Sequence, residues 1–353
     1  MDYHHLGGSG LRVSRVGLGC IPFGTALSER DSRRAVDAFA DAGGNYLDTA
    51  NVYGGGTRGD HERHAGTSER TVGKLIKGRR DRFVVGTKGA WVMTDTPHAN
   101  SFGLSRTYLA TEIDASLQRL GTDYIDLYHC HVQDPYTPIE ETMGVLDDYV
   151  RAGKIRYVGV SNWGGWQLVK ACMYARQHGL SPILCNQIWY NLADRSAEFA
   201  IVPACRDQGV SVTVWGGYAQ GFLTGRYDRA MVEPPAGSRI LSSKPSESSS
   251  WQRLAVDRVW NTLDVMREIA AHHGKSLANV AMAWLLQSKG CDVFLMGAFA
   301  YDQVPDSLAG AELTLSPEEA AALDRVSELE APYPMSFWNT FVYEDSEHFG
   351  GLR

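Results

Sequence analysis

The chain has 353 residues, of which 44% are hydrophobic and 21% charged, a composition typical of a protein that folds around an apolar core. Its formal net charge is −7, without long acidic or basic runs, so we do not expect nucleic acid as a partner. Neither a bilayer-spanning apolar stretch nor an N-terminal signal region is evident, so we expect neither a membrane partner nor secretion.

The cysteines favour a cytoplasmic protein. The six of them, at positions 20, 130, 172, 185, 205 and 291, include no CxxC pair, and three lie in or beside apolar runs. We therefore expect buried, reduced thiols. Four of them on one metal ion would need closer spacing, so we predict no metal site.

Eight short apolar runs predict strands, because most are rich in β-branched or aromatic residues. They span residues 15–21, 45–50, 83–88, 124–132, 155–162, 183–190, 210–216 and 292–298. Ahead of them, the segment 3–17 contains the turn sequence GGSG between two short runs. We expect it to form a hairpin that closes one end of the molecule.

Helical patterns lie between these runs. Ser28 is a suitable N-cap for a helix that Gly43 and Gly44 end. Further helices are predicted from apolar spacing in 105–120, 138–152, 164–178, 251–273 and from residue 277 onward. Eight strand–helix repeats predict an α/β fold, a (β/α)8 TIM barrel with an N-terminal hairpin cap. We expect one domain over residues 1–353, with long loops at 54–66 and 216–250 and a C-terminal tail at 331–353.

In such a barrel the reactive residues gather at the C-terminal ends of the strands. Asp48, Lys88 and His131 stand at three successive strand ends, and Tyr53 lies in the loop after the first of them. A lysine ammonium ~4 Å from a phenol favours the phenolate by ~4 kcal/mol at an effective dielectric of about 20. We therefore expect Lys88 to lower the pKa of Tyr53, opposed in part by Asp48, so that Tyr53 can protonate a carbonyl oxygen while His131 orients it. His129 shares the strand face of His131, which is preferred because it lies nearer the strand end.

These segments resemble the aldo-keto reductases. LDTANVYG, VVGTK and YIDLYHCH match the family's aspartate–tyrosine, lysine and histidine segments, and GKIRYVGVSNW, NQIWYNLADRSAE and WGGYAQGFLTGRY follow in family order. The branch with the greatest similarity contains aryl-alcohol dehydrogenase-like proteins and deoxysugar ketoreductases. The resemblance implies that Asp48, Tyr53, Lys88 and His131 form a catalytic tetrad, with NADPH as hydride source and NADH possible.

The resemblance also implies a cofactor site. Ser161, Asn162 and Gln187 would bind the nicotinamide carboxamide, and Trp215 would stack on the ring. Arg226 and Arg239 would bind the pyrophosphate. The loop entry would contribute Gly216, Gly217, Tyr218 and Gln220. The adenosine would be bound by Gly297, Phe299, Gln303 and Ser307.

Three departures from the family pattern bear on function, in the adenosine-binding segment, in the loop entry and in the loop after Tyr53. Phe299 stands where members that prefer NADPH often carry a basic or hydroxyl residue, which weakens the expected preference for NADP over NAD. Ser307 replaces a usual asparagine, and Gly216 and Gly217 replace a common Ser-Pro pair, which loosens the loop entry.

The loop 54–66 is an enlargement, interpreted as a lid over the substrate. It contains Asp60, His61, Glu62 and His64, but adjacent residues rarely converge on one ion, so metal binding is not expected there. Aromatic side chains suited to line a substrate pocket are Trp91 and Tyr218 foremost, then Trp189 and Phe222.

The sequence favours an enzyme that reduces a small-molecule aldehyde or ketone. The alternative is a nucleotide-binding regulatory subunit similar to potassium-channel β-subunits, which carry asparagine where this chain has His131. A barrel aldolase using Lys88 as a Schiff-base amine ranks last, because Asp48 would raise the pKa of that lysine. The sequence identifies neither the substrate, an aromatic aldehyde or a keto-sugar among the options, nor the oligomeric state.

Overall fold

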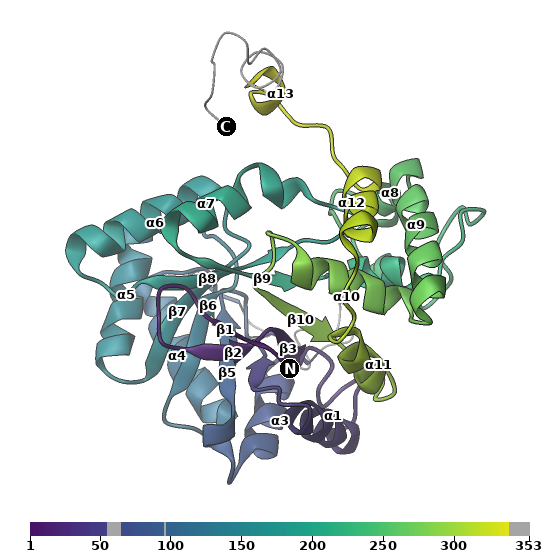
Figure 1. Ribbon diagram of the computed structural model, residues 1–353. Helices are drawn as coiled ribbons and strands as arrows, with labels where there is room; N and C mark the ends of the chain where they lie inside the picture. The colour runs from purple at the N-terminus through teal and green to yellow at the C-terminus, as the bar shows by residue number, and fades with distance from the viewer. Residues whose placement is uncertain (55–64, 95–96, 339–353) are drawn as a thin grey trace.

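A computed structural model describes residues 1–54, 65–94 and 97–338. Eight parallel strands close into a barrel that helices surround (Figure 1), which confirms the predicted (β/α)8 fold. In chain order the strands are β3 (Val16–Gly19), β4 (Tyr46–Asp48), β5 (Val84–Gly89), β6 (Ile125–Cys130), β7 (Ile155–Ser161), β8 (Ile183–Trp189), β9 (Ser211–Trp215) and β10 (Val293–Gly297), and β10 pairs with β3 to close the ring.

The strands read as continuous apolar runs because both of their faces are buried. Val85 and Val158 belong to the large core between barrel and helices. Tyr46 and Leu127 belong to a smaller core with the hairpin residues. The Tyr46 ring fits because Gly17, on the neighbouring strand β3, has no side chain: a Cβ there would lie 2.9 Å from the ring.

The N-terminal hairpin closes the bottom of the barrel as predicted. Its strands β1 (Tyr3–His5) and β2 (Arg12–Ser14) pair antiparallel. Leu6 and Val13 are fully buried. The backbone N–H of Gly7 donates to Oγ of Ser211, the first residue of β9, over 2.8 Å. The hairpin therefore covers the N-terminal strand ends and leaves the opposite mouth for chemistry.

The predicted helices are present, and capping residues explain where several begin. They are α1 (Glu29–Asp41), α4 (Arg106–Leu120), α5 (Ile139–Arg151), α6 (Gly165–His178), α9 (Asp257–His273) and α10 (Leu277–Gln287). The side chain of Ser28 accepts from the Asp31 N–H, and Ser105 caps α4 in the same way. The predicted helix over 251–273 is divided in two, because Ala255 leaves the helical conformation between α8 (Trp251–Leu254) and α9.

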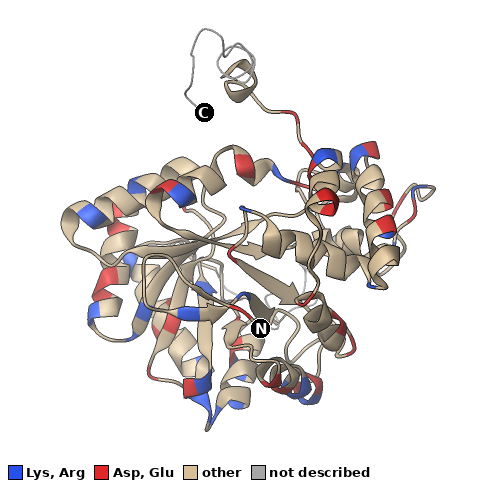
Figure 2. Cartoon of the chain, in the orientation of Figure 1, with Lys and Arg blue, Asp and Glu red and all other residues tan. Residues whose placement is uncertain are grey.

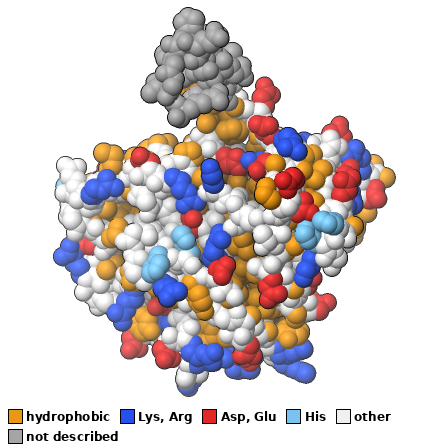
Figure 3. Space-filling view, in the orientation of Figure 1, with side chains coloured by type: hydrophobic (Ala, Val, Ile, Leu, Met, Phe, Trp, Pro, Cys, Tyr) orange, Lys and Arg blue, Asp and Glu red, His pale blue; other side chains and the backbone are white. Residues whose placement is uncertain are grey.

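Other helices are shorter and were not predicted. These are α3 (Thr67–Ile76), α7 (Ile201–Gln208), α11 (Gln303–Gly310), α12 (Pro317–Val326) and α13 (Met335–Trp338), with 3₁₀ turns η1 (Arg80–Arg82), η2 (Ser196–Phe199), η3 (Ala219–Thr224) and η4 (Arg239–Ser242). Charged residues of both signs are distributed along the outer helices (Figure 2) and intermixed on the face that Figure 3 shows. Among the described residues, every helix is too short or too polar to cross a bilayer.

The segment after β9 packs against the body through aromatic side chains. The indole N–H of Trp251 donates to the Val232 carbonyl over 3.0 Å. Phe222 is fully buried against Tyr227, Trp251 and Trp260. Phe222 is thus a core residue, and its expected place in a substrate pocket is wrong. The six cysteines are buried and free, as predicted.

Candidate active site

The C-terminal ends of β4 and β5 bring a buried lysine to a buried carboxylate. Lys88 Nζ donates to Asp48 Oδ2 over 2.6 Å, to the Thr49 carbonyl over 2.8 Å and to the Tyr53 hydroxyl over 3.3 Å. These partners use all three donors of the ammonium group. Burial acts to lower the pKa of Lys88, but Asp48 and Tyr53 stabilise the charged form and the pKa is raised. A lysine held charged in this way is unsuited to Schiff-base chemistry.

The pKa of Tyr53 shifts in the direction opposite to the one predicted. Burial raises it above the ordinary value, and the lowering by Lys88 compensates only in part because Asp48 also acts to raise it. The sequence spacing indicated that a cation lies near Tyr53, but it did not indicate that the phenol is removed from solvent. Tyr53 is therefore fully protonated at neutral pH, and its proton is available for donation.

His131 stands next to Tyr53. Their ring centroids are 5.7 Å apart with an 80° interplanar angle, and the Trp91 ring approaches His131 in the same edge-on manner at 6.1 Å. Burial lowers the pKa of His131 well below 6.5, and Lys88 and His129 add to this effect. The imidazole is neutral at physiological pH. Among the described residues, its Nδ1 has no hydrogen-bond partner.

His129 lies deeper in the barrel. It is fully buried, with Nδ1 3.4 Å from the Thr87 carbonyl and Nε2 3.4 Å from Cys185 Sγ. Of the two histidines on this strand face, the geometry thus brings His131 and not His129 to Tyr53.

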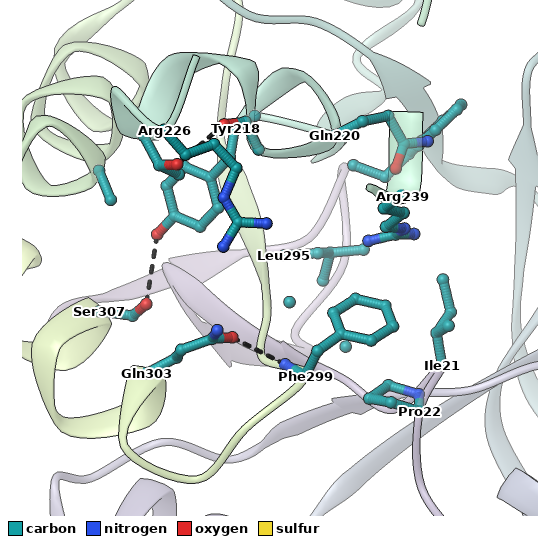
Figure 4. A pocket seen from close by; sticks show the side chains of 18 of the residues that line it. Ile21, Pro22, Tyr218, Gln220, Arg226, Arg239, Leu295, Phe299, Gln303 and Ser307 are labelled. Atoms are coloured by element: carbon teal, nitrogen blue, oxygen red, sulfur yellow. Dashed lines mark hydrogen bonds between the residues drawn. The ribbon is translucent and has the colours of Figure 1, made fainter. Parts of the chain in front are cut away.

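A cavity of about 950 Å³ adjoins Asp48 and Tyr53 and extends along the barrel mouth (Figure 4). Most residues expected to hold the cofactor line it: Gln187, Trp215, Gly216, Gly217, Tyr218, Gln220, Arg226, Arg239, Gly297, Phe299, Gln303 and Ser307. Lys88 and Ser161 are buried and are not among the residues that line it. The partly buried His131, the exposed Asn162 and Trp91, which is 46% exposed, are also not among the lining residues.

Ser161 and Asn162 are joined to the cavity wall by hydrogen bonds. Asn162 Nδ2 donates to Ser161 Oγ and to the His131 carbonyl, and Trp215 Nε1 donates to Asn162 Oδ1 over 2.9 Å. Ser161 Oγ donates to the Gln187 carbonyl, while Gln187 Nε2 donates to Asp48 over 2.9 Å. The amides expected to read a carboxamide are therefore fixed in orientation, and Gln187 connects them to the buried ion pair.

At the far end of the cavity, residues from two segments meet. The Arg239 guanidinium, on η4, lies over the Phe299 ring at 4.3 Å from its centroid. The Gln303 side chain accepts from the Phe299 N–H over 2.8 Å. Figure 4 shows Tyr218 directed at Ser307, 3.5 Å from hydroxyl to hydroxyl. Tyr218 thus belongs to the far part of the cavity, and its expected contact with substrate remains a prediction.

Comparison with known proteins agrees with this arrangement. The family model described as "Aldo/keto reductase family" matches residues 15–328. The chain belongs to the aldo/keto reductase family. It is 34% identical to YrpG of Bacillus subtilis (strain 168), named an uncharacterized oxidoreductase, over 90% of this chain and 93% of the relative. It is 32% identical to the versiconal hemiacetal acetate reductase of Aspergillus parasiticus, over 94% and 97% of the two chains. It is 31% identical to a "Probable voltage-gated potassium channel subunit beta" of Oryza sativa subsp. japonica, over 92% and 96%.

In this aldo/keto reductase, two residues that sequence reasoning missed connect the walls of the site. The Tyr108 hydroxyl, at the start of α4, accepts from Asn51 Nδ2 over 3.2 Å and donates to the Trp91 carbonyl. Asn51 lies two residues before Tyr53, and both Asn51 and Tyr108 are buried. Apolar periodicity indicated only that Tyr108 lies on a helix, because the spacing of residues does not reveal which groups the tyrosine hydroxyl contacts.

A buried ionic network lies behind the same helix. Arg119 bridges Glu69 and Glu112, and Glu69 in turn accepts from Thr87 Oγ1 over 2.5 Å. Because Thr87 precedes Lys88 on β5, this network fixes the outer side of the strand that holds the lysine. The four polar residues of the enlarged loop, Asp60, His61, Glu62 and His64, lie outside the described residues.

Replacing Tyr108 by Phe should lower the free energy of unfolding by about 1–3 kcal/mol, because a buried amide and the Trp91 carbonyl lose their partner. Urea denaturation measures the change in the free energy of unfolding. The fluorescence of Trp91, obtained by subtracting the emission of the Trp91→Phe variant from that of the protein with Trp91, should also change. The matched control is Tyr149→Phe, which removes a half-buried hydrogen bond of 2.9 Å to the Ala110 carbonyl. Equal losses of stability, with unchanged Trp91 emission in both variants, would contradict the connecting role of Tyr108.

Proposed function

We propose that this protein reduces an aldehyde or ketone to the alcohol, with a nicotinamide dinucleotide as hydride source and Tyr53 as general acid. The observation that supports it most directly is the Tyr53 hydroxyl, 3.3 Å from a lysine that a buried carboxylate holds charged, at the wall of a large cavity. The family and its reductase-named members support carbonyl reduction in general.

The residues along the cavity fit a dinucleotide. Trp215 offers an aromatic face beside a fixed group of amides. Arg226 and Arg239 bring two positive charges to one wall, as a pyrophosphate requires. Two residues before Phe299, a Cβ on Gly297 would have no neighbour within 4 Å, so the backbone there faces open space. We propose that these residues hold the nicotinamide, the pyrophosphate and the adenosine, in that order.

The chemistry that a bound nicotinamide supplies is the transfer of hydride to the carbonyl carbon. Tyr53 gives its proton to the carbonyl oxygen in the same step, and the phenolate left behind is stabilised by the adjacent Lys88 ammonium. Asp48 keeps Lys88 charged and directs it toward Tyr53. The neutral His131 donates an N–H hydrogen bond to the carbonyl oxygen and so orients the substrate. Solvent then restores the Tyr53 proton.

The proposed substrates are carbonyl compounds that carry an aromatic or other apolar group. Trp91 presents a large apolar surface beside His131, and it is 46% exposed. Exposed apolar surface next to reacting groups favours apolar ligands over small polar ones, because burial of that surface is favourable.

A regulatory subunit remains the second candidate, because a potassium-channel β-subunit is among the relatives. Such a protein would bind the nucleotide with little or no turnover. The contact between His131 and Tyr53 favours the enzyme, because a protein that only binds the nucleotide does not need these two side chains to lie together.

Substituting Tyr53 by Phe should lower kcat for carbonyl reduction by about 10²–10⁴-fold, the usual contribution of a positioned acid. The phenyl ring keeps the shape of the site, so the dissociation constant for NADPH, measured by fluorescence titration, should change by less than about threefold. Trp91→Phe, which leaves the proton donor intact, is the control for a general disturbance of the site. Turnover by Tyr53→Phe at the wild-type rate would refute the assignment.

The pH dependence follows from the pKa directions. The pKa of Tyr53 lies above its ordinary ~10 and that of His131 well below its ordinary ~6.5, so neither group changes charge between about pH 6.5 and 10. We expect kcat/KM for reduction to be flat over this range and to fall only above it, as Tyr53 loses its proton. Initial rates in overlapping buffers at constant ionic strength measure the profile. An inflection near pH 7–8 would contradict the proposed protonation states.

The nucleotide preference should be weak. Phe299 brings no charge to a 2′-phosphate and instead holds Arg239 against its ring. We expect NADPH and NADH to differ by less than about tenfold in kcat/KM, measured by absorbance loss at 340 nm with aromatic aldehydes and keto-sugars. Phe299→Lys should favour NADPH by about 10–100-fold, as a charge-assisted hydrogen bond provides, whereas Phe299→Leu should not. A strong NADPH preference in the wild type would contradict this role of Phe299.

A further inference from the structure

Away from the barrel mouth, α9 and α12 lie side by side as an antiparallel pair (Figure 1). At one end, Arg258 of α9 donates to the Ser327 carbonyl, just after α12, over 3.1 Å. At the other end, the last turn of α9 brings His272 and His273 to Glu319, in the first turn of α12. The helix pair is thus joined by a hydrogen bond from an arginine side chain to a backbone carbonyl at one end and by side chains typical of metal sites at the other.

The three side chains converge closely, and although His272 and His273 are adjacent in the sequence, both imidazoles face the Glu319 carboxylate. His272 Nδ1 lies 3.0 Å from Glu319 Oε1, and His273 Nε2 lies 2.9 and 3.0 Å from the two carboxylate oxygens. Each residue offers one possible ligand atom, and these three atoms all lie within 4.8 Å of one another. Among the described residues this is the one group of three or more His, Cys, Asp or Glu side chains that meets such a condition.

The carboxylate is oriented by its own helix. Glu319 Oε2 accepts from the Ser316 N–H over 2.9 Å, and Ser316 Oγ accepts from the Glu319 N–H, which together form a capping box. The capping box fixes where the carboxylate points without help from the imidazoles. The site therefore has one preorganised oxygen ligand, and the two histidines complete it.

The separations suit a transition-metal ion. Zinc binds imidazole nitrogen at about 2.0–2.1 Å and carboxylate oxygen at about 2.0–2.2 Å, so two ligands at a tetrahedral angle stand about 3.3 Å apart. The observed oxygen–nitrogen distances are a few tenths of an ångström shorter. The two imidazole nitrogens, which lie within 4.8 Å of each other, must also stand about 3.3 Å apart, so small rotations of all three side chains are needed to admit the ion. The C-terminal end of α9 carries partial negative charge, which favours a cation, and the N-terminal end of α12 carries partial positive charge, which opposes it, so the carboxylate supplies the net attraction.

The exposure of the group allows access from solvent. The side chains of His272, His273 and Glu319 are 76%, 25% and 15% exposed. A metal ion can therefore enter without rearrangement of the fold and keep water as its fourth ligand. Two imidazoles and one carboxylate are donors that suit Zn²⁺, Ni²⁺ and Cu²⁺ better than Mg²⁺ or Ca²⁺.

We propose that His272, His273 and Glu319 form a binding site for a divalent first-row transition-metal ion, with zinc as the best match, which ties the end of α9 to the start of α12. None of the three side chains is among the residues that line the cavity at the barrel mouth. It does not depend on the proposed reductase activity.

The test uses the full-length chain without an affinity tag, stripped of metal and titrated with ZnCl2 by isothermal calorimetry. We expect one ion per chain with a dissociation constant on the order of 1–10 μM, about −7 to −8 kcal/mol. The midpoint of thermal unfolding should rise with Zn²⁺ and not with Mg²⁺, since an ion that binds only the folded state stabilises it.

Two variants locate the ion. Glu319→Gln keeps the capping box, because glutamine serves at this position too, but removes the charged ligand. His273→Ala removes one imidazole. Each should weaken zinc binding at least tenfold, and the melting temperature of Glu319→Gln should no longer rise with Zn²⁺. His178→Ala, on α6, is the matched control and should bind zinc as the wild type does.

The histidines of the enlarged loop are a competing source of affinity, so the titration is repeated with His61→Ala/His64→Ala. Retention of the one-ion binding in that double variant supports the α9–α12 site. Loss of binding there, or wild-type zinc affinity in both Glu319→Gln and His273→Ala, would overturn the proposal, as would failure of the wild type to bind zinc at all.

Discussion

The rest of the site depends on the ion pair between Lys88 and Asp48. Both side chains are buried, and removing either charge from water costs several kcal/mol unless every hydrogen-bonding atom finds a partner. The structure meets this demand with four further groups: the Thr49 carbonyl, the Tyr53 hydroxyl, the Gln187 amide on β8 and the Tyr46 hydroxyl on β4. One unpaired partner would leave a buried charge, so the mouth of the barrel is held in a single arrangement.

The two neighbours of the ion pair, Tyr53 and His131, have pKa values shifted in opposite directions, and burial is the main cause of both shifts. Tyr53 and His131 have little access to solvent, and burial disfavours the charged form of each, which raises one pKa and lowers the other. Both side chains are therefore neutral at physiological pH beside a charged lysine. In the proposed reaction this arrangement has a use, because the acid begins fully protonated and the cation is already in position for the phenolate that forms.

The walls around this centre are connected through polar side chains behind them. Tyr108 joins the segment of Tyr53 to that of Trp91, and the Arg119 network supports β5 from outside. At the other end, Arg239 and Phe299 bring the long segment after β9 to the loop after β10. The cavity is thus formed by segments far apart in sequence, with the barrel as their common support.

The sequence by itself determined the barrel, its hairpin cap and the meeting of Asp48, Lys88, Tyr53 and His131. Parallel strands bury both faces and end at one edge, so apolar runs and the polar residues that follow them carry this information directly. Only the tertiary structure decided the net pKa shift of Tyr53, the burial of Phe222, the division of the helix at Ala255 and the connecting role of Tyr108. Each of these depends on which atoms surround a side chain in three dimensions, and spacing along one chain does not encode how much solvent those neighbours exclude.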